Sequence, residues 1–205
     1  MGVSGTRRIG VIGGTFDPIH YGHLVAAQEC AAVLGCEKVL FVPAHEPPHK
    51  LEEIVTAATH RAAMVEIAIA DNPRFVLSTV ELDRGGVSYT VDTLRTLREE
   101  LGGAELHFIV GIDALLDLPG WHDPAGILRT AFVAAVSRPG YPEVDFGVLE
   151  QIMPGATHRV RIVPMPGHDI SSTDLRERLA TGRPVRYLLP DAVIAYAAAH
   201  GLYRD

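Results

Sequence analysis

The chain has 205 residues, 47% of them hydrophobic, and its 18 Lys and Arg against 25 Asp and Glu give a formal net charge of −7. This length allows one domain with a sizeable core, whereas the acidic balance excludes a general attraction for nucleic acid. Two cysteines are too few for a disulfide framework, and no apolar stretch approaches the length of a membrane span. We therefore expect one domain over residues 1–205, with residues 1–7 as a polar leader, in a cytoplasmic protein without a signal peptide or a membrane partner.

Along the chain, short apolar runs typical of buried strands alternate with segments of helical periodicity. The predicted strands cover residues 9–12, 38–42, 75–81, 105–110, 132–136 and 160–163. The predicted helices cover residues 23–34, 57–70, 91–101, 125–130, 143–153, 172–181 and 191–200. This alternation predicts an α/β fold: a Rossmann-like, doubly wound parallel sheet of five to six strands with helices on both faces. Ligands of such sheets bind beyond the carboxyl ends of the strands, near the point where strand order reverses.

The segment that joins the first predicted strand to the first predicted helix reads GGTFDPIHYGH and spans residues 13–23. It is neither the dinucleotide fingerprint nor a P-loop. We expect its paired glycines, Gly13 and Gly14, to open a turn and let a bound group approach the backbone closely. The helix start supplies free N–H groups and a positive dipole end. Because His20 and His23 are one helical turn apart, they can converge on one phosphate, and the segment predicts a phosphate site.

A second segment, ISSTDLR at residues 170–176, follows the last predicted strand and opens a helix. Ser171, Ser172 or Thr173 can be the N-cap, which leaves first-turn N–H groups free for an anion. Arg176 lies one turn into the helix, where its guanidinium could fork onto phosphate oxygens. Taken alone, a plain N-cap followed by an exposed arginine is an equally good interpretation.

Together the two segments resemble the signatures (G)G-[ST]-F-D-P-x-H-x-G-H and I-S-S-T-x-[ILV]-R of the nucleotidyltransferase superfamily. Its members join a nucleotide to a phosphate acceptor and release pyrophosphate. Three segments between them resemble bacterial nicotinate-nucleotide adenylyltransferases, which make deamido-NAD from nicotinate mononucleotide and ATP. They are VPAHEPPHK at 42–50, GVSYTVDTL at 86–94 and GIDALLDLPGW at 111–121. The resemblance extends from about residue 8 to residue 203.

The resemblance implies two groups of binding residues and a catalytic group drawn from both. The residues implied for ATP are Gly13, Gly14, Thr15, Phe16, His20, His23, Asp113, Ser171, Ser172, Thr173 and Arg176. Those implied for the nicotinate nucleotide are Lys50, Thr90, Val91, Trp121 and His122. The catalytic residues expected among them are His20, His23, Lys50 and Arg176. A pyridinium ring stacked on the Trp121 indole would gain a cation–π interaction of about 1 kcal/mol or more.

The expected chemistry is in-line attack of the 5′-phosphate of nicotinate mononucleotide on the α-phosphorus of ATP, with loss of pyrophosphate. The acceptor phosphate is already an anion, so alignment and positive groups suffice without a general base. Mg²⁺ is expected to arrive on the ATP phosphates, without a dedicated set of protein ligands. Asp17 is expected to cap or brace the turn.

Two alternatives stay open at this stage: a phosphopantetheine adenylyltransferase, which shares both end signatures, and a non-catalytic module that senses ATP or NAD. The expected partners are ATP and nicotinate mononucleotide, with neither nucleic acid nor membrane, and homo-oligomers are common among the related enzymes. The residues do not settle whether nicotinate or nicotinamide mononucleotide is preferred.

Overall fold

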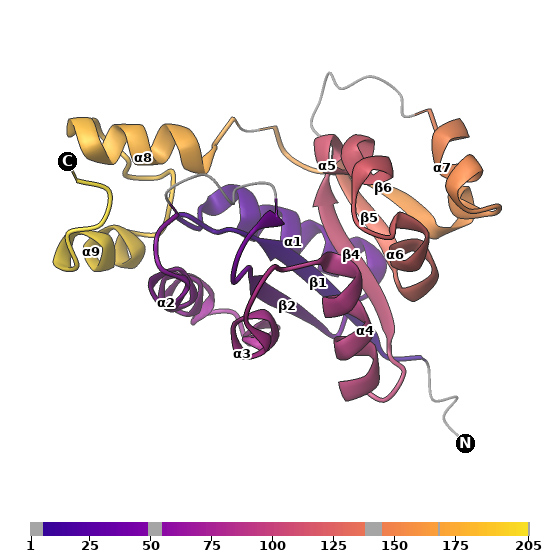
Figure 1. Ribbon diagram of the computed structural model, residues 1–205. Helices are drawn as coiled ribbons and strands as arrows, with labels where there is room; N and C mark the ends of the chain where they lie inside the picture. The colour runs from indigo at the N-terminus through magenta and orange to yellow at the C-terminus, as the bar shows by residue number, and fades with distance from the viewer. Residues whose placement is uncertain (1–5, 49–54, 138–144, 168, 205) are drawn as a thin grey trace.

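The computed structural model describes residues 6–48, 55–137, 145–167 and 169–204 (Figure 1). Within these residues one six-stranded sheet runs in the order β3-β2-β1-β4-β5-β6. Every neighbouring pair of strands is parallel. The strands are β1 (Arg8–Gly14), β2 (Lys38–Pro43), β3 (Phe75–Leu77), β4 (Glu105–Gly111), β5 (Phe132–Ser137) and β6 (Val160–Pro164). The predicted doubly wound α/β fold is confirmed, and the sheet has six of the expected five to six strands.

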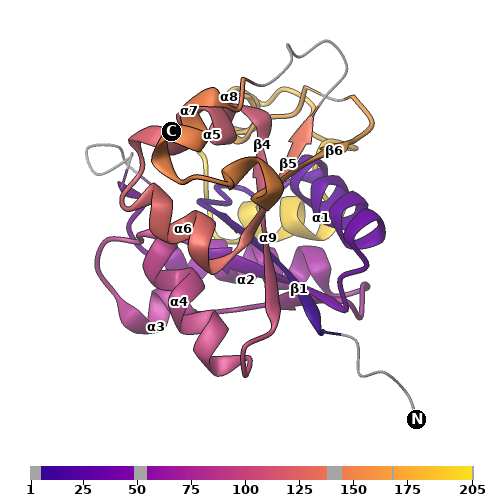
Figure 2. The same ribbon diagram turned by 90° about the vertical axis from the view of Figure 1, so that its right-hand side faces the viewer.

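Helices cover both faces of the sheet. They are α1 (Tyr21–Leu34), α2 (Ala58–Ile69), α3 (Val80–Arg84), α4 (Thr90–Glu100), α5 (Ile112–Asp117), α6 (Pro124–Thr130), α7 (Gly147–Ile152), α8 (Ser172–Thr181) and α9 (Asp191–Ala199), with 3₁₀ turns η2 (Leu118–Gly120) and η3 (Ala156–Arg159). Figure 2 shows α1 on one side of the sheet and α4 and α6 on the other. The orange-to-yellow helices α8 and α9 lie at the end of the molecule near α2, whereas α7 lies at the opposite end (Figure 1).

Two apolar layers follow from the alternation of side chains along each strand. In β2, Val39 and Phe41 pack in the layer of α1, α2, α8 and α9. Leu40 and Val42 pack in the layer of α4, α5 and α6. Both faces of the strand are buried, and this explains why the strands read as continuous apolar runs rather than as alternating ones.

The strand order reverses between β1 and β4, which are neighbours in the sheet although two strands separate them in the chain. The strands β2 and β3 extend the sheet from β1 in one direction, and β5 and β6 extend it from β4 in the other. A crevice forms beyond the carboxyl ends of the strands at such a reversal. The histidine-bearing segment begins at the carboxyl end of β1, as expected.

The predicted strand over residues 75–81 is wrong in its second half. The strand β3 ends at Leu77, and Val80–Arg84 form α3. The edge strand pairs with β2 only from Val39 to Phe41, and the Ser78 N–H makes a last bond to the Phe41 carbonyl. The chain then turns, which buries the Glu81 carboxylate against the Thr93 hydroxyl.

The predicted helix over residues 143–153 is too long. Residues 143 and 144 lie outside the described residues, and α7 begins only at Gly147. The Asp145 carboxylate accepts a hydrogen bond from the Gly147 N–H at 2.8 Å, a local Asx-type bond that competes with helix formation.

The paired glycines do not open the turn, because β1 continues through Gly14. Within residues 13–23 it is instead Phe16 that has a positive φ, at 51°. Further along, the segment after β4 carries no predicted element, but it forms α5 and η2 and so brings Asp113 into a helical first turn.

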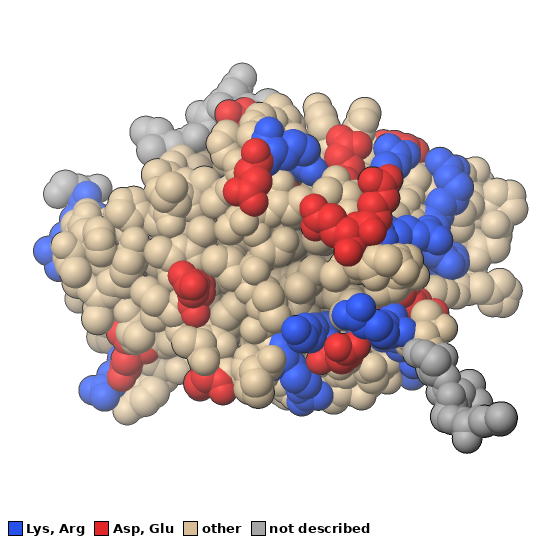
Figure 3. Space-filling model, turned by 90° about the horizontal axis from the view of Figure 1, so that it is seen from below, with Lys and Arg blue, Asp and Glu red and all other residues tan. Residues whose placement is uncertain are grey.

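Acidic and basic side chains are interspersed on the face of the molecule seen from below Figure 1 (Figure 3). On that face Lys and Arg do not gather into a continuous basic stripe of the kind that binds nucleic acid. No helix in the described part of the chain is long and apolar enough to cross a membrane. From the expected leader, Arg7 pairs with Glu37 at 3.1 Å, and its carbonyl accepts a bond from the Glu105 N–H.

Candidate active site

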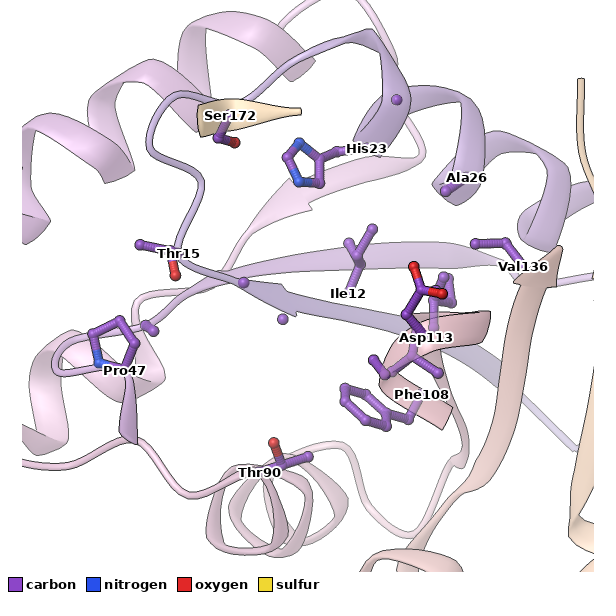
Figure 4. A pocket seen from close by; sticks show the side chains of 18 of the residues that line it. Ile12, Thr15, His23, Ala26, Pro47, Thr90, Phe108, Asp113, Val136 and Ser172 are labelled. Atoms are coloured by element: carbon purple, nitrogen blue, oxygen red, sulfur yellow. The ribbon is translucent and has the colours of Figure 1, made fainter. Parts of the chain in front are cut away.

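A cavity of about 860 Å³ lies beyond the carboxyl ends of β1 and β4. Its walls come from the starts of α1, α4, α5 and α8 and from the loop that follows β2. Figure 4 shows His23 and Ser172 together on one side of it, Thr90 and Pro47 on another, and Asp113 directed toward its centre. Its volume lies in the upper part of the range for small-molecule sites, so it has room for more than a single mononucleotide.

His20 and His23 form the start of α1. His20 is the N-cap residue, and its Nδ1 accepts a hydrogen bond from the Gly22 N–H at 3.1 Å. The Nδ1 of His23 accepts one from the His20 N–H at 3.2 Å. The two rings stack with centroids 3.8 Å apart, and both residues line the cavity.

These two bonds assign the tautomers of the rings. Because each Nδ1 accepts a hydrogen bond from a backbone N–H, it carries no proton, and each neutral ring has its proton on Nε2. Protonation of Nδ1 would break a capping bond. Each ring can then donate a hydrogen bond through Nε2.

The second segment docks directly on the first. The Ser172 hydroxyl donates to the Pro18 carbonyl at 2.9 Å, and Arg176 Nη1 donates to the Asp17 carbonyl at 2.8 Å. Ser171 is the N-cap of α8 and accepts a bond from the Asp174 N–H. Two segments about 150 residues apart thus face one cavity.

Of the residues predicted to bind ATP, the following line the cavity: Gly13, Gly14, Thr15, His20, His23, Asp113, Ser171 and Ser172. Three others are not among its lining residues: Phe16, Thr173 and Arg176. The Phe16 ring is buried against Phe41 and His23. Arg176 Nη2 lies 3.5 Å from the Thr173 hydroxyl, beside the bond from its Nη1 to Asp17.

The residues predicted for the nicotinate nucleotide line another part of the cavity. Thr90, Trp121 and His122 are among its lining residues, while Val91 is fully buried in the core. The Tyr89 and His122 rings lie 4.3 Å apart and join the start of α4 to the loop that carries Trp121. The helix α4 has no side-chain cap, and the Asp92 and Thr93 N–H groups donate to the Tyr89 carbonyl, which leaves the N–H groups of Thr90 and Val91 for an acceptor group.

Lys50 lies outside the described residues, but the part of its loop that is described is attached to the segment before α4. The His45 N–H donates to Ser88 Oγ at 2.9 Å, and the Ser88 N–H donates to the Glu46 carbonyl at 3.0 Å. Pro47 and Pro48 then line the cavity together with Thr90. Two of the three segments singled out in the sequence are therefore parts of one wall.

Asp17 braces the first segment, as expected. Its carboxylate, which is 3% exposed, accepts bonds from the Thr56 N–H at 3.2 Å and from the Tyr203 hydroxyl at 2.6 Å.

Two buried ionisable residues at or next to the cavity are not among the residues predicted from the sequence. Glu81 lines the cavity, and burial raises the pKa of its carboxyl, while hydrogen bonds from Thr93 and Ser88 oppose that shift. It fell within a run that reads as a strand, so the sequence carried no signal for it.

The second is Arg61, which is 1% exposed and donates to the backbone carbonyls of Thr15, Ala44, His45 and Thr56. A signal for it existed. Arg61 stands three, four and seven residues before Met64, Val65 and Ala68, which are all buried, so it interrupts the apolar stripe of α2.

The described residues contain no group of three or more His, Cys, Asp or Glu side chains that could hold a metal ion. A magnesium ion that keeps its waters and binds substrate phosphates needs no such group. The donor set at the cavity therefore fits a metal that arrives with a phosphate substrate.

Comparison with known proteins gives a consistent result. Residues 11–178 match the cytidylyltransferase-like family. The chain is 49% identical, over 96% of its length and 98% of the relative's, to a probable nicotinate-nucleotide adenylyltransferase of Roseiflexus sp. (strain RS-1). It is 47% identical to a protein of the same description from Saccharopolyspora erythraea, over 98% of this chain and 92% of that one.

Solved structures support the fold. The nicotinic acid mononucleotide adenylyltransferase of Plasmodium falciparum, complexed with NaAD, superposes with a TM-score of 0.77 at 20% identity, over 96% of this chain and 97% of that chain. A putative nicotinate-nucleotide adenylyltransferase from Vibrio parahaemolyticus superposes with a TM-score of 0.68 at 18% identity, over 97% and 96% of the two chains.

Proposed function

The chain belongs to the cytidylyltransferase-like family and to the nicotinate-nucleotide adenylyltransferases, and we infer that it transfers AMP from ATP to nicotinate mononucleotide. The products are deamido-NAD, an intermediate of NAD biosynthesis, and pyrophosphate. The relatives carry the name of this activity rather than that of a phosphopantetheine adenylyltransferase.

One observation carries the proposal. The histidine pair of α1 and the start of α8 face the same cavity as Thr90 and Trp121, which come from two other segments. A triphosphate site and a second nucleotide site would thus share one crevice, so that an acceptor phosphate could meet the α-phosphate of ATP there. Such an arrangement of two reactants accounts for much of the rate enhancement that an enzyme without a general base can achieve.

We assign the α-phosphate to His20 and His23. In the proposed step, an oxygen of the acceptor phosphate forms a bond to the α-phosphorus, and the bond from that phosphorus to the bridging oxygen of pyrophosphate breaks. The charge that builds up on the α-phosphate oxygens would be stabilised by the two Nε2–H donors. Since each Nδ1 is engaged with a backbone N–H, the role that we propose for the rings is hydrogen-bond donation, which requires no proton transfer.

The β- and γ-phosphates are assigned to the start of α8, with Lys50 and Arg176. Arg176 uses Nη1 to hold the Asp17 carbonyl, and a guanidinium has five N–H donors, so others are left for phosphate oxygens. Gly13, Gly14 and Thr15 would contact ATP through their backbone, and Asp113 would accept hydrogen bonds from the ribose hydroxyls. That Phe16 and Thr173 contact ATP remains a prediction.

For the nicotinate nucleotide, we propose that the pyridinium ring stacks on Trp121 beside Thr90. The nicotinate carboxylate would accept bonds from N–H groups of Val91 and His122. The uncapped start of α4 supports this assignment, because a carboxylate is favoured at a helix N-terminus.

Nucleotidyltransferases that use ATP require a divalent metal, and we propose that here it is Mg²⁺ held by the ATP phosphates. Bound in this way, the ion would neutralise part of the charge on the leaving pyrophosphate. Further proposals are a single domain over residues 1–205, supported by the match over 11–178, and a cytoplasmic location, supported by the free thiols of Cys30 and Cys36. A homo-oligomer remains a prediction that light scattering can check.

Pyrophosphate release in the presence of ATP tests the function. Four reactions are compared, with nicotinate mononucleotide, nicotinamide mononucleotide, phosphopantetheine and no acceptor. We expect turnover with nicotinate mononucleotide and formation of deamido-NAD in equal amount. Turnover with phosphopantetheine alone would contradict the proposal, as would tight ATP binding without turnover on any acceptor.

A further inference from the structure

The side chain of Arg61, in α2, is buried among backbone carbonyls. Its Nε donates to the Thr56 carbonyl at 2.7 Å and its Nη1 to the Thr15 carbonyl at 2.7 Å. Its Nη2 donates to the Ala44 carbonyl at 2.6 Å and to the His45 carbonyl at 3.1 Å. Four acceptors, one from the β1–α1 connection and three from the β2–α2 connection, therefore meet on a single guanidinium.

These loops belong to the candidate active site. Thr15 follows β1 and leads into the histidine segment, and Ala44 follows β2; both residues line the cavity. The Ala44 N–H also donates to the Gly14 carbonyl at 2.9 Å, so the two loops leave the sheet side by side. The Arg61 side chain, which is 1% exposed, bonds to both loops from their buried side.

The connection continues to the nicotinate side. The carbonyl of the Ala44–His45 peptide accepts from Arg61, and the N–H of the same peptide donates to Ser88 Oγ at 2.9 Å. Because a trans peptide is planar, with its C=O and N–H pointing in opposite directions, bonds at both ends fix its orientation. Ser88 directly precedes Tyr89 and Thr90, which line the cavity.

We propose that Arg61 is a positioning residue. It holds Thr15, in the segment assigned to ATP, and the nicotinate wall, formed by Ser88, Tyr89 and Thr90, in one fixed arrangement. The proposal rests on the function inferred above. Arg61 acts through the backbone of Thr15 and Ala44 and touches no reacting atom. The planar guanidinium fork is required, since a lysine offers a single charged nitrogen that cannot reach four acceptors on two connections.

The main test is Arg61→Lys, which keeps the charge and removes the fork. We expect a folded protein whose kcat/KM falls on the order of 100-fold, because small displacements of positioned reactants have effects of this size. The KM values of both substrates should rise. A variant with wild-type kcat and KM values that is merely less stable would show that Arg61 is structural only, and would overturn the proposal.

Arg159→Lys is the matched control. Arg159 also donates to two backbone carbonyls, those of Leu128 and Arg129, but neither of those residues lines the cavity. Its kinetic constants should equal those of the wild type. Equal losses in the two lysine variants would mean that any arginine-to-carbonyl cluster affects turnover through stability, and would contradict the proposal.

Ser88→Ala provides a second test if Arg61→Lys does not fold. It removes the link from His45 to the nicotinate wall and leaves the four Arg61 bonds intact. We expect a several-fold higher KM for nicotinate mononucleotide and an unchanged KM for ATP. No change in either KM, or an equal change in both, would contradict the proposed connection.

ATP binding measured by calorimetry separates this proposal from the proposed function. If the wild type released no pyrophosphate with any acceptor, the function would be wrong. Weaker ATP binding by Arg61→Lys than by the wild type and by Arg159→Lys would still support the positioning role, and equal binding by all three would refute it.

Discussion

The hydroxyl of Tyr203 donates a hydrogen bond of 2.6 Å to Oδ1 of Asp17. The end of the chain thereby supports the first motif across 186 positions of sequence. The other carboxylate oxygen of Asp17 accepts from the Thr56 N–H. Burial raises the pKa of the Tyr203 phenol, and its hydrogen bond to Asp17 adds to the shift, so this hydroxyl remains a donor at neutral pH.

Replacement Tyr203→Phe should therefore destabilise the fold. It leaves a buried carboxylate oxygen without its partner, which costs about 1–3 kcal/mol. Urea unfolding monitored by circular dichroism measures the change. Tyr187→Phe is the matched control, since Tyr187 is 79% exposed and should change the free energy of unfolding by less than about 0.5 kcal/mol. Equal effects of the two changes would contradict the bracing role.

His20 is both the cap of α1 and a proposed α-phosphate ligand, and two variants separate these roles. His20→Ala loses both, so it should lower kcat by about 10²–10³-fold and cost about 0.5–2 kcal/mol of stability. His20→Asn retains a capping side chain, so kcat should fall similarly while stability stays near that of the wild type. Rapid-quench kinetics and thermal unfolding measure the two effects. Near-normal turnover of either variant would overturn the assignment of His20.

Replacement of Trp121 should raise the KM for nicotinate mononucleotide and leave the KM for ATP unchanged. Loss of the stacked ring in Trp121→Ala removes about 1–2 kcal/mol of interaction, which corresponds to a roughly 5- to 30-fold higher KM for nicotinate mononucleotide. Trp121→Phe should recover part of the loss. The KM for ATP serves as the internal control, and an equal rise in both KM values would argue against stacking on the pyridinium ring.

Glu81 makes stability depend on pH in a defined direction. Its folded-state pKa lies above its ordinary value of 4.5, so its contribution to stability is fully present below that value. The contribution is lost as pH rises through the folded pKa, because the unfolded state ionises more readily. Glu81→Gln should therefore gain stability relative to the wild type as the pH is raised from 4 to 8, as measured by urea unfolding.

Glu150 is the control with the opposite sign. A hydrogen bond from the Thr157 hydroxyl, with others from the backbone, lowers the pKa of this exposed carboxyl below 4.5. The advantage of the wild type over Glu150→Gln should be present above that pH and disappear as the pH falls. If both variants showed the same pH trend, the assigned environments of the two carboxylates would be wrong.

Metal removal tests the proposed source of the divalent ion. EDTA in excess should abolish pyrophosphate release, and Mg²⁺ added together with ATP should restore it. The unfolding temperature measured without nucleotide should not change, because no cluster of side chains in the described residues binds a metal. A chelator-induced loss of stability would point to a protein-held ion instead.

The sequence predicted the sheet and most elements because their signals are local. Apolar runs define buried strands, and the N-cap serine of α8 appears in the residues themselves. Predictions failed where a tertiary contact overruled the local pattern. The run at 75–81 reads as one strand, but β2 offers partners only as far as Phe41. No element was predicted for the segment 111–121, yet it folds into α5 and η2.

The residues alone determined the family and its chemistry, because the motif around His20 and His23 and the one ending at Arg176 are local strings whose residue types suit phosphate. Only the tertiary structure decided how these residues are held. It showed that Nδ1 of each histidine is occupied by a backbone N–H, that Arg176 ties the two motifs together, and that Arg61 lies beneath the loops. Such roles depend on carbonyl and amide groups, which every residue carries and no sequence pattern distinguishes.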